Sequence, residues 1–134
     1  MPDTAALLAE YMEAVQRKDI DAMAACWSDD AEGIHPLRPD RAWHGLDGFR
    51  RVWTRMWENN PTGRYEVVST ATSDDHIYIE SRIELPDGTI IPSVNVFDVD
   101  NGKLQQVRVY TDMPMRDGVA IDDFITQGAD EEGR

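Results

Sequence analysis

The chain has 134 residues, 41% of them hydrophobic, and its 26 Asp and Glu against 13 Lys and Arg give a formal net charge of −13. This length predicts one globular domain with a real core. The acidic charge has the wrong sign for a nucleic-acid surface, and no apolar run approaches the roughly 20 residues of a membrane-spanning helix. We therefore expect a soluble domain without nucleic-acid or membrane partners.

The cysteine content and the N-terminal residues indicate the cellular compartment in which we expect the protein. The single cysteine, Cys26, excludes an internal disulfide and fits a reducing environment. The first residues have no basic region before their apolar ones, which is not typical of a signal peptide. We expect the protein in the cytoplasm, with Cys26 as a buried, inert thiol on a helix.

The N-terminal residues predict a helix that Asp3 or Thr4 can cap. Apolar residues at helical spacing form one stripe, and Arg17 and Lys18 end the helix favourably for its dipole. The stripe consists of Leu7, Leu8, Tyr11, Met12 and Val15. A tyrosine on a buried stripe is either a core residue or a hydroxyl that faces a cavity.

A second helix is predicted after Asp19, its expected cap. Ile20, Met23 and Trp27 have the spacing i, i+3 and i+7, so we expect all three to face inward from this helix. Residues 28–30 should end the helix, and residues 31–35 should form a short strand that Pro36 stops.

Residues 37–44, which follow Pro36 and include Pro39, predict a loop, and a third helix is expected over about residues 47–58. Its wide apolar face comprises Phe49, Val52, Trp53, Met56 and Trp57. The Asn59-Asn60-Pro61 segment should end this helix.

The second half of the chain alternates polar and apolar residues as strands do. The predicted strands are 65–72, 77–85, 89–99 and 104–111, separated by Asp-, Gly- and Pro-containing turns. Short turns between sequential strands indicate an antiparallel meander, and helices followed by a meander indicate an α+β fold.

One predicted strand has apolar residues on both of its faces. Ser93, Asn95 and Phe97 lie on one face, and Val94 and Val96 lie on the other. Because the helices can cover only one face of the sheet, we expect a homodimer through the other.

The remaining residues and the motif searches add little. Residues 117–134 form an acidic tail, in which we expect a helical turn over 119–125 and disorder over 128–134. There is no Gly-rich phosphate loop, cysteine pair for zinc or GxSxG elbow. His35, Asp40 and His44 lack the spacing of metal ligands, so we expect no metal and no cofactor.

Several segments, taken together, resemble the nuclear-transport-factor-2-like (NTF2-like) superfamily, and within it the SnoaL-like cyclases and the ketosteroid isomerases. They are "DIDA", "SDDAEGIHP", "HGLDGFRRVW" and "FDVDNGKLQQVRVYTD". The resemblance runs from about Ala5 to Met115. It implies a cystatin-like or NTF2-like cone over residues 1–116, in which N-terminal helices pack on a curved antiparallel sheet and enclose a pocket.

The resemblance to ketosteroid isomerases also implies site residues. In "AEYMEAV", Tyr11 falls on that family's oxyanion-hole tyrosine. In "DDAEGIHP", His35 falls on its catalytic aspartate, and in "SVNVFDV", Asn95 falls on its protonated aspartic acid. Trp27 and Trp53 fall on two supporting tyrosines. With Phe97 and Met113, these tryptophans are the expected pocket wall.

These residue types suit proton transfer next to a carbonyl. A neutral imidazole can accept the proton, while a phenol O–H and an amide N–H stabilise the enolate oxygen. The resemblance therefore implies a cofactor-independent isomerase or cyclase that acts on a small apolar carbonyl compound.

Two other functions stay open. If His35 bonds to backbone in a pocket wall and Asn95 is satisfied locally, the protein is a non-catalytic binder of small molecules. Arg82 and Glu84 alternate as R-x-E, which is compatible with an epoxide hydrolase but also with cross-strand charge pairs. Val107 and Val109 occupy the positions where such a hydrolase would need Trp and Asp. A dehydratase is a further possible function within the superfamily.

Overall fold

The computed structural model describes residues 3–37, 39–59, 62–111, 115–116 and 119–120. Its helices are α1 (Thr4–Gln16), α2 (Ile20–Ala24), the 3-10 helix η1 (Pro39–Arg41) and α3 (Gly45–Asn59). Its strands are β1 (Trp27–Ile34), β2 (Trp43–His44), β3 (Arg64–Thr72), β4 (His76–Glu84), β5 (Ile90–Asp100), β6 (Lys103–Thr111), β7 (Met115–Arg116) and β8 (Val119–Ala120). Within these residues no helix has the length and hydropathy needed to cross a membrane.

Six strands form one sheet in the order β2-β1-β6-β5-β4-β3. Strands β3 to β6 form the predicted antiparallel meander. The sheet as a whole is mixed, however, because β1 pairs parallel with β6. The long connection through α3 allows this parallel pairing, which a short turn would not.

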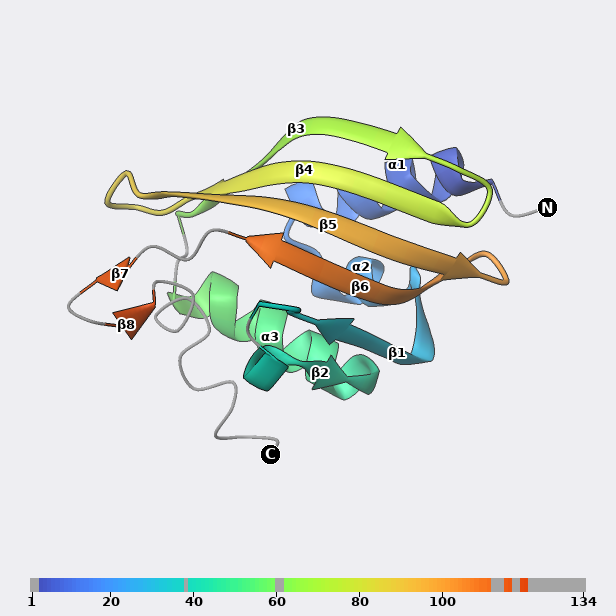
Figure 1. Cartoon of the computed structure of the whole chain (residues 1–134), viewed down its shortest axis with the longest axis horizontal. Helices are drawn as coiled ribbons and strands as arrows, with labels where there is room; N and C mark the ends of the chain where they lie inside the picture. Colours follow the sequence, from blue (N-terminus) through green and yellow to red (C-terminus); the bar gives the residue numbers. More distant parts are fainter. Residues whose placement is uncertain (1–2, 38, 60–61, 112–114, 117–118, 121–134) are drawn as a thin grey trace.

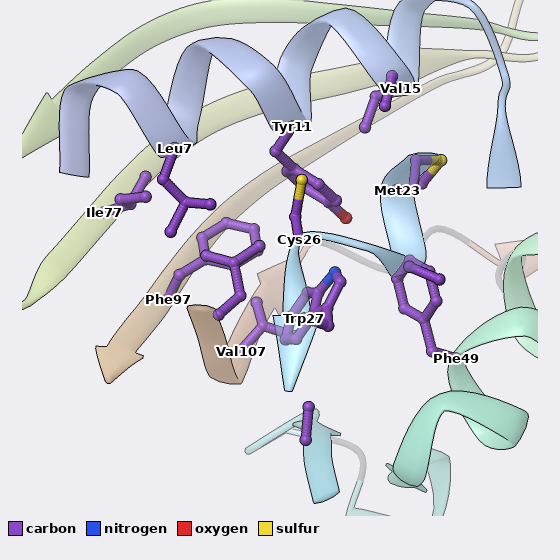
Figure 2. Packing of buried hydrophobic residues seen from close by; sticks show 14 of the residues in the cluster. Leu7, Tyr11, Val15, Met23, Cys26, Trp27, Phe49, Ile77, Phe97 and Val107 are labelled. Atoms are coloured by element: carbon purple, nitrogen blue, oxygen red, sulfur yellow. The ribbon is translucent and has the colours of Figure 1, made fainter. Parts of the chain in front are cut away.

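The helices pack on one face of this sheet (Figure 1). Helix α1 lies behind β3 and β4, and α3 lies behind β1. The core between these layers includes Met23, Phe49 and Ile79, which are fully buried. Figure 2 shows how α1, β1 and α3 contribute side chains to one continuous cluster.

Both predicted helix caps are confirmed. The Ala6 backbone N–H donates to Asp3 Oδ1 at 3.1 Å, and the Ala22 N–H donates to Asp19 Oδ1 at 3.0 Å. These bonds satisfy amides that have no partner within the helix.

The second helix is shorter than predicted. It ends at Ala24, and Trp27 begins a strand instead of completing a helical stripe. The Leu104 N–H donates to the Cys26 carbonyl at 2.8 Å, and Trp27 pairs with Leu104. This tertiary pairing overrides the helical periodicity, although Trp27 still faces inward.

Two other segments differ from expectation. The predicted loop at 37–44 contains η1 and the short strand β2, which pairs with β1. In the tail, Val119 and Ala120 form a strand with β7, so the predicted helical turn is wrong at its start. Residues 121–125 and 128–134 lie outside the described residues.

Cys26 lies in the turn before β1 rather than on a helix, and it is buried. Its Sγ is 3.6 Å from the Ala22 carbonyl oxygen. Burial, with the negative charge of Glu10, raises the pKa of Cys26 to about 11. The thiol is therefore protonated near neutral pH and is a poor nucleophile.

Gly33 makes room for an indole. It pairs with Trp43, and a Cβ atom added at Gly33 would lie 2.1 Å from Trp43 Nε1. The ring has little freedom to move aside, because its centroid lies 5.3 Å from that of Trp27 and 5.5 Å from that of Phe49.

We expect Gly33→Ala to lower the free energy of unfolding by about 1–3 kcal/mol, the usual cost of overpacking a core. Urea denaturation measures this change. In a Trp43→Phe background the same substitution should cost less, because phenylalanine lacks the contacted nitrogen. An equal cost in both backgrounds would contradict the steric explanation.

Candidate active site

A cavity of about 170 Å³ lies between the sheet and the helices. Its lining includes all three predicted catalytic residues, Tyr11, His35 and Asn95. The predicted wall residues Trp27, Trp53 and Phe97 line it as well. Met113, the remaining predicted wall residue, lies outside the described residues. The cavity thus brings the proposed base and both proposed donors together, while their catalytic roles stay predictions.

Tyr11 reaches the cavity from α1 and is only 4% exposed. Its ring centroid lies 6.0 Å from that of Trp27 and 5.8 Å from that of Phe97. In Figure 2 its hydroxyl oxygen and the indole nitrogen of Trp27 lie toward each other. Burial and the neighbouring Tyr65 raise the phenol pKa far above its usual value, and the Trp27 indole N–H opposes this only in part. Tyr11 therefore keeps its proton and can donate a hydrogen bond.

His35 follows the last residue of β1. Ala31 and Gly33 alternate toward the core, and His35 continues this alternation because the residue before a proline favours an extended backbone. Ile34 pairs with Arg108, so the register brings His35 beside Val109 on β6. The side chain is half-buried in the cavity wall.

Asn95 comes from β5, where it pairs with Val109. His35, Val109 and Asn95 thus form a row across three strands, with about 10 Å between the outer two. Ser93 Oγ donates to Asn95 Oδ1 at 2.9 Å, which orients the amide. The N–H groups of Asn95 are thereby directed away from Ser93 and can donate to a ligand.

Sequence reasoning missed several hydroxyl residues of the wall, among them Tyr65 on β3 and Ser81 on β4. Burial raises the pKa of Tyr65, while the nearby Ser81 and Asn95 side chains lower it. Tyr65 is thus a second tyrosine near Tyr11. At the two positions where ketosteroid isomerases have supporting tyrosines, this chain has Trp27 and Trp53. The inward alternation of both strands was visible in the sequence, but their register was not.

Charge is distributed unevenly around the cavity. Among the described residues its lining contains no Asp or Glu, although the chain has 26 of them, and the basic side chains there are His35 and Arg41. A wall without carboxylates favours a neutral base and does not repel a developing enolate. Arg41 is the charged cavity residue that sequence reasoning missed.

The charged groups of the epoxide-hydrolase alternative lie elsewhere. Arg82 Nη2 is 3.0 Å from Glu66 Oε1, and Arg64 Nη2 is 2.7 Å from Glu84 Oε2. These are cross-strand pairs between β3 and β4, and none of the four residues lines the cavity. The arrangement fits the ordinary charged-pair interpretation of R-x-E.

Of the three residues considered for a metal site, His35, Asp40 and His44, His35 is the one that lines the cavity. His44 is exposed, and its Nδ1 lies 3.3 Å from Glu32 Oε2. Asp40 and His44 do not line the cavity that His35 enters. In the part of the chain that the structure describes, no three His, Cys, Asp or Glu residues are grouped as metal ligands would be.

Comparison with known proteins identifies relatives. The family model described as "SnoaL-like domain" matches residues 8–107. No curated protein is significantly similar to this chain.

Solved structures with the same fold include an NTF2-like protein of unknown function from Mesorhizobium loti, with 19% identity and a TM-score of 0.73 over 84% of this chain and 97% of that one. A candidate ketosteroid isomerase from Kribbella flavida has 15% identity and a TM-score of 0.71, over 83% of this chain and 78% of that one. A candidate SnoaL-like polyketide cyclase from Shewanella putrefaciens has 16% identity and a TM-score of 0.67, over 84% and 81%. At these identities the likeness confirms the predicted NTF2-like fold.

Proposed function

The chain belongs to the SnoaL-like domain family of the NTF2-like superfamily, and from this premise we propose that it catalyses cofactor-independent proton transfer on a small apolar carbonyl compound, as an isomerase or a cyclase. One observation carries the proposal. A histidine, a buried phenol and an oriented amide line the same cavity, and none of the described lining residues is a carboxylate.

The proposed reaction balances without a cofactor. Neutral His35 accepts a proton from the carbon next to the carbonyl, and the electron pair of that C–H bond moves onto the carbonyl oxygen. Tyr11 and Asn95 donate hydrogen bonds to the resulting enolate oxygen. The imidazolium then returns the proton to another carbon, which isomerises the compound. In a cyclase, the enolate carbon instead attacks a second carbonyl carbon, and the new alkoxide takes the proton.

Cavity size supports a small substrate. At about 170 Å³ the cavity is comparable to the protein cavity of about 150 Å³ that binds benzene. A compound with one ring, or two small ones, suits this volume better than a four-ring steroid. Aromatic rings of Trp27, Trp53 and Phe97 in the wall favour an apolar body.

Proton–deuterium exchange into a panel of small unsaturated ketones tests the proposal, because exchange reports enolisation even when the natural substrate is unknown. We expect the protein to accelerate exchange above the buffer rate for at least one ketone that it binds. If the ketones bind but exchange no faster than in buffer, the rival function, a non-catalytic binder of small molecules, becomes the better one.

We further propose that the uncovered face of the sheet binds a second copy of the chain. Tyr78, Val94 and Tyr110 lie across β4, β5 and β6 on this face and are 40%, 44% and 39% exposed. Some of the adjoining charges are paired, as in the contact between Arg108 Nη1 and Asp98 Oδ2 at 3.0 Å. An apolar patch of this kind can meet its own copy in spite of the net negative charge.

Val94→Arg should produce monomers, because it puts a long charged side chain at the centre of this apolar patch. Sedimentation velocity at micromolar concentration measures the effect, and we expect a dimer for the wild type. Leu37→Arg, in an exposed loop, is the matched control and should stay dimeric. A monomeric wild type would contradict the proposed interface.

A further inference from the structure

Three hydroxyl residues lie in register across the cavity side of the sheet. Ser81 on β4 pairs with Ser93 on β5, and Ser93 pairs with Thr111 on β6. All three line the cavity. Ser93 Oγ donates to Asn95 Oδ1, and Thr111 Oγ1 donates to the Pro92 carbonyl oxygen at 2.6 Å.

Ser81 differs from the other two. It is 2% exposed, and its Oγ has no hydrogen-bond partner within the described residues. A buried hydroxyl without a partner destabilises a fold, and alanine would fill the same space without that cost. The cavity wall therefore contains an unused donor and acceptor in a lining that also includes apolar residues such as Ile83 and Ile91.

Tyr65 brings a second hydroxyl to the same place. It lies on β3, where Val67 pairs with Ser81 and Tyr65 pairs with Ile83, so Tyr65 is a diagonal neighbour of Ser81. The Tyr65 side chain lies near enough to the side chains of Ser81 and Asn95 for both to lower its pKa, yet Tyr65 and Ser81 do not form a hydrogen bond of good geometry. A ligand oxygen between them can bond to both.

The position of Ser81 relative to Asn95 sets the spacing between the two oxygen atoms of such a ligand. Asn95 pairs with Ile79, two residues from Ser81 on the same strand face. Diagonal neighbours of this kind are about 7–8 Å apart. His35 is farther away, three strand spacings or about 14 Å from Ser81 along the sheet.

We propose that Ser81 and Tyr65 form a second polar subsite, which binds an uncharged oxygen function of the substrate, a hydroxyl above all, across the ring from the carbonyl. The inference rests on the proposed function for the position of the carbonyl at Tyr11 and Asn95. It narrows the substrate class to oxygenated ring ketones, with the second oxygen on the side away from His35.

Matched ligands test the subsite by binding alone. Calorimetry would compare cyclohexanone with 4-hydroxycyclohexanone in the wild type, in Ser81→Ala and in Tyr65→Phe. We expect the preference for the hydroxylated ketone to be roughly tenfold greater in the wild type than in either variant, since each variant removes one partner of the ligand oxygen. Ser69→Ala on the outer face of β3 is the control and should keep the wild-type preference.

The outcomes separate the two proposals. A wild type that does not prefer the hydroxylated ketone, or that binds neither compound, overturns the subsite, as does an unchanged preference in Ser81→Ala. A retained preference without proton exchange overturns the proposed catalysis and leaves the subsite standing. Because Ser81→Ala removes an unpartnered hydroxyl, its urea midpoint should equal or exceed that of the wild type.

Discussion

Replacing His35 with alanine should abolish proton exchange and leave ketone binding nearly unchanged. The base acts on the reacting carbon and stabilises the transition state, whereas the apolar wall supplies the binding energy. General bases typically contribute a factor of 10²–10⁴ to the rate. Exchange measured by NMR in heavy water gives the rate, and fluorescence quenching of the cavity tryptophans gives the affinity.

The pH dependence gives this prediction a second readout. Only the neutral imidazole accepts a proton, so exchange by the wild type should rise with pH and level off once His35 has lost its proton. His44→Ala, which removes an exposed imidazole outside the cavity, should leave rate and profile unchanged. If His35→Ala exchanges protons as fast as the wild type while both bind the ketone, His35 is not the base.

Tyr11→Phe should lower turnover by about 10²–10³, the usual cost of one oxyanion donor. Phenylalanine keeps the ring contacts with Trp27 and Phe97 and removes only the hydroxyl. The protein should therefore fold normally and bind the ketone with similar affinity. Asn95→Ala should have an effect of similar size, since the oriented amide is the second donor.

Separating rate from affinity decides whether these groups act as donors in the transition state. We expect kcat to fall in both variants with little change in Kd. Tyr78→Phe, the same change on the exposed face of β4, should leave both quantities unchanged. Equal losses of affinity and turnover in Tyr11→Phe would mean that the hydroxyl serves binding only.

Interactions between residues close in sequence determine much of this fold, and the sequence alone predicts them. Asp3 and Asp19 cap the helices as predicted, because a carboxylate that bonds the free amides of the first turn depends only on nearby residues. Alternation along β5 likewise separated its two faces correctly, since the side-chain period of a strand is two. The resemblance to known relatives added the cone and pointed to Tyr11, His35 and Asn95.

Long-range pairing decided what local patterns could not. Trp27 satisfies a helical period yet lies in a strand, because residues distant in sequence, Cys26 and Leu104, share a hydrogen bond there. Ser81 and Tyr65 come together, with Ser81 one diagonal step from Asn95, only through the registers of β3, β4 and β5. The period of apolar residues in a sequence, two for a strand and 3.6 for a helix, predicts which face a side chain lies on. Its neighbours on that face are determined by strand register, which depends on the whole sheet.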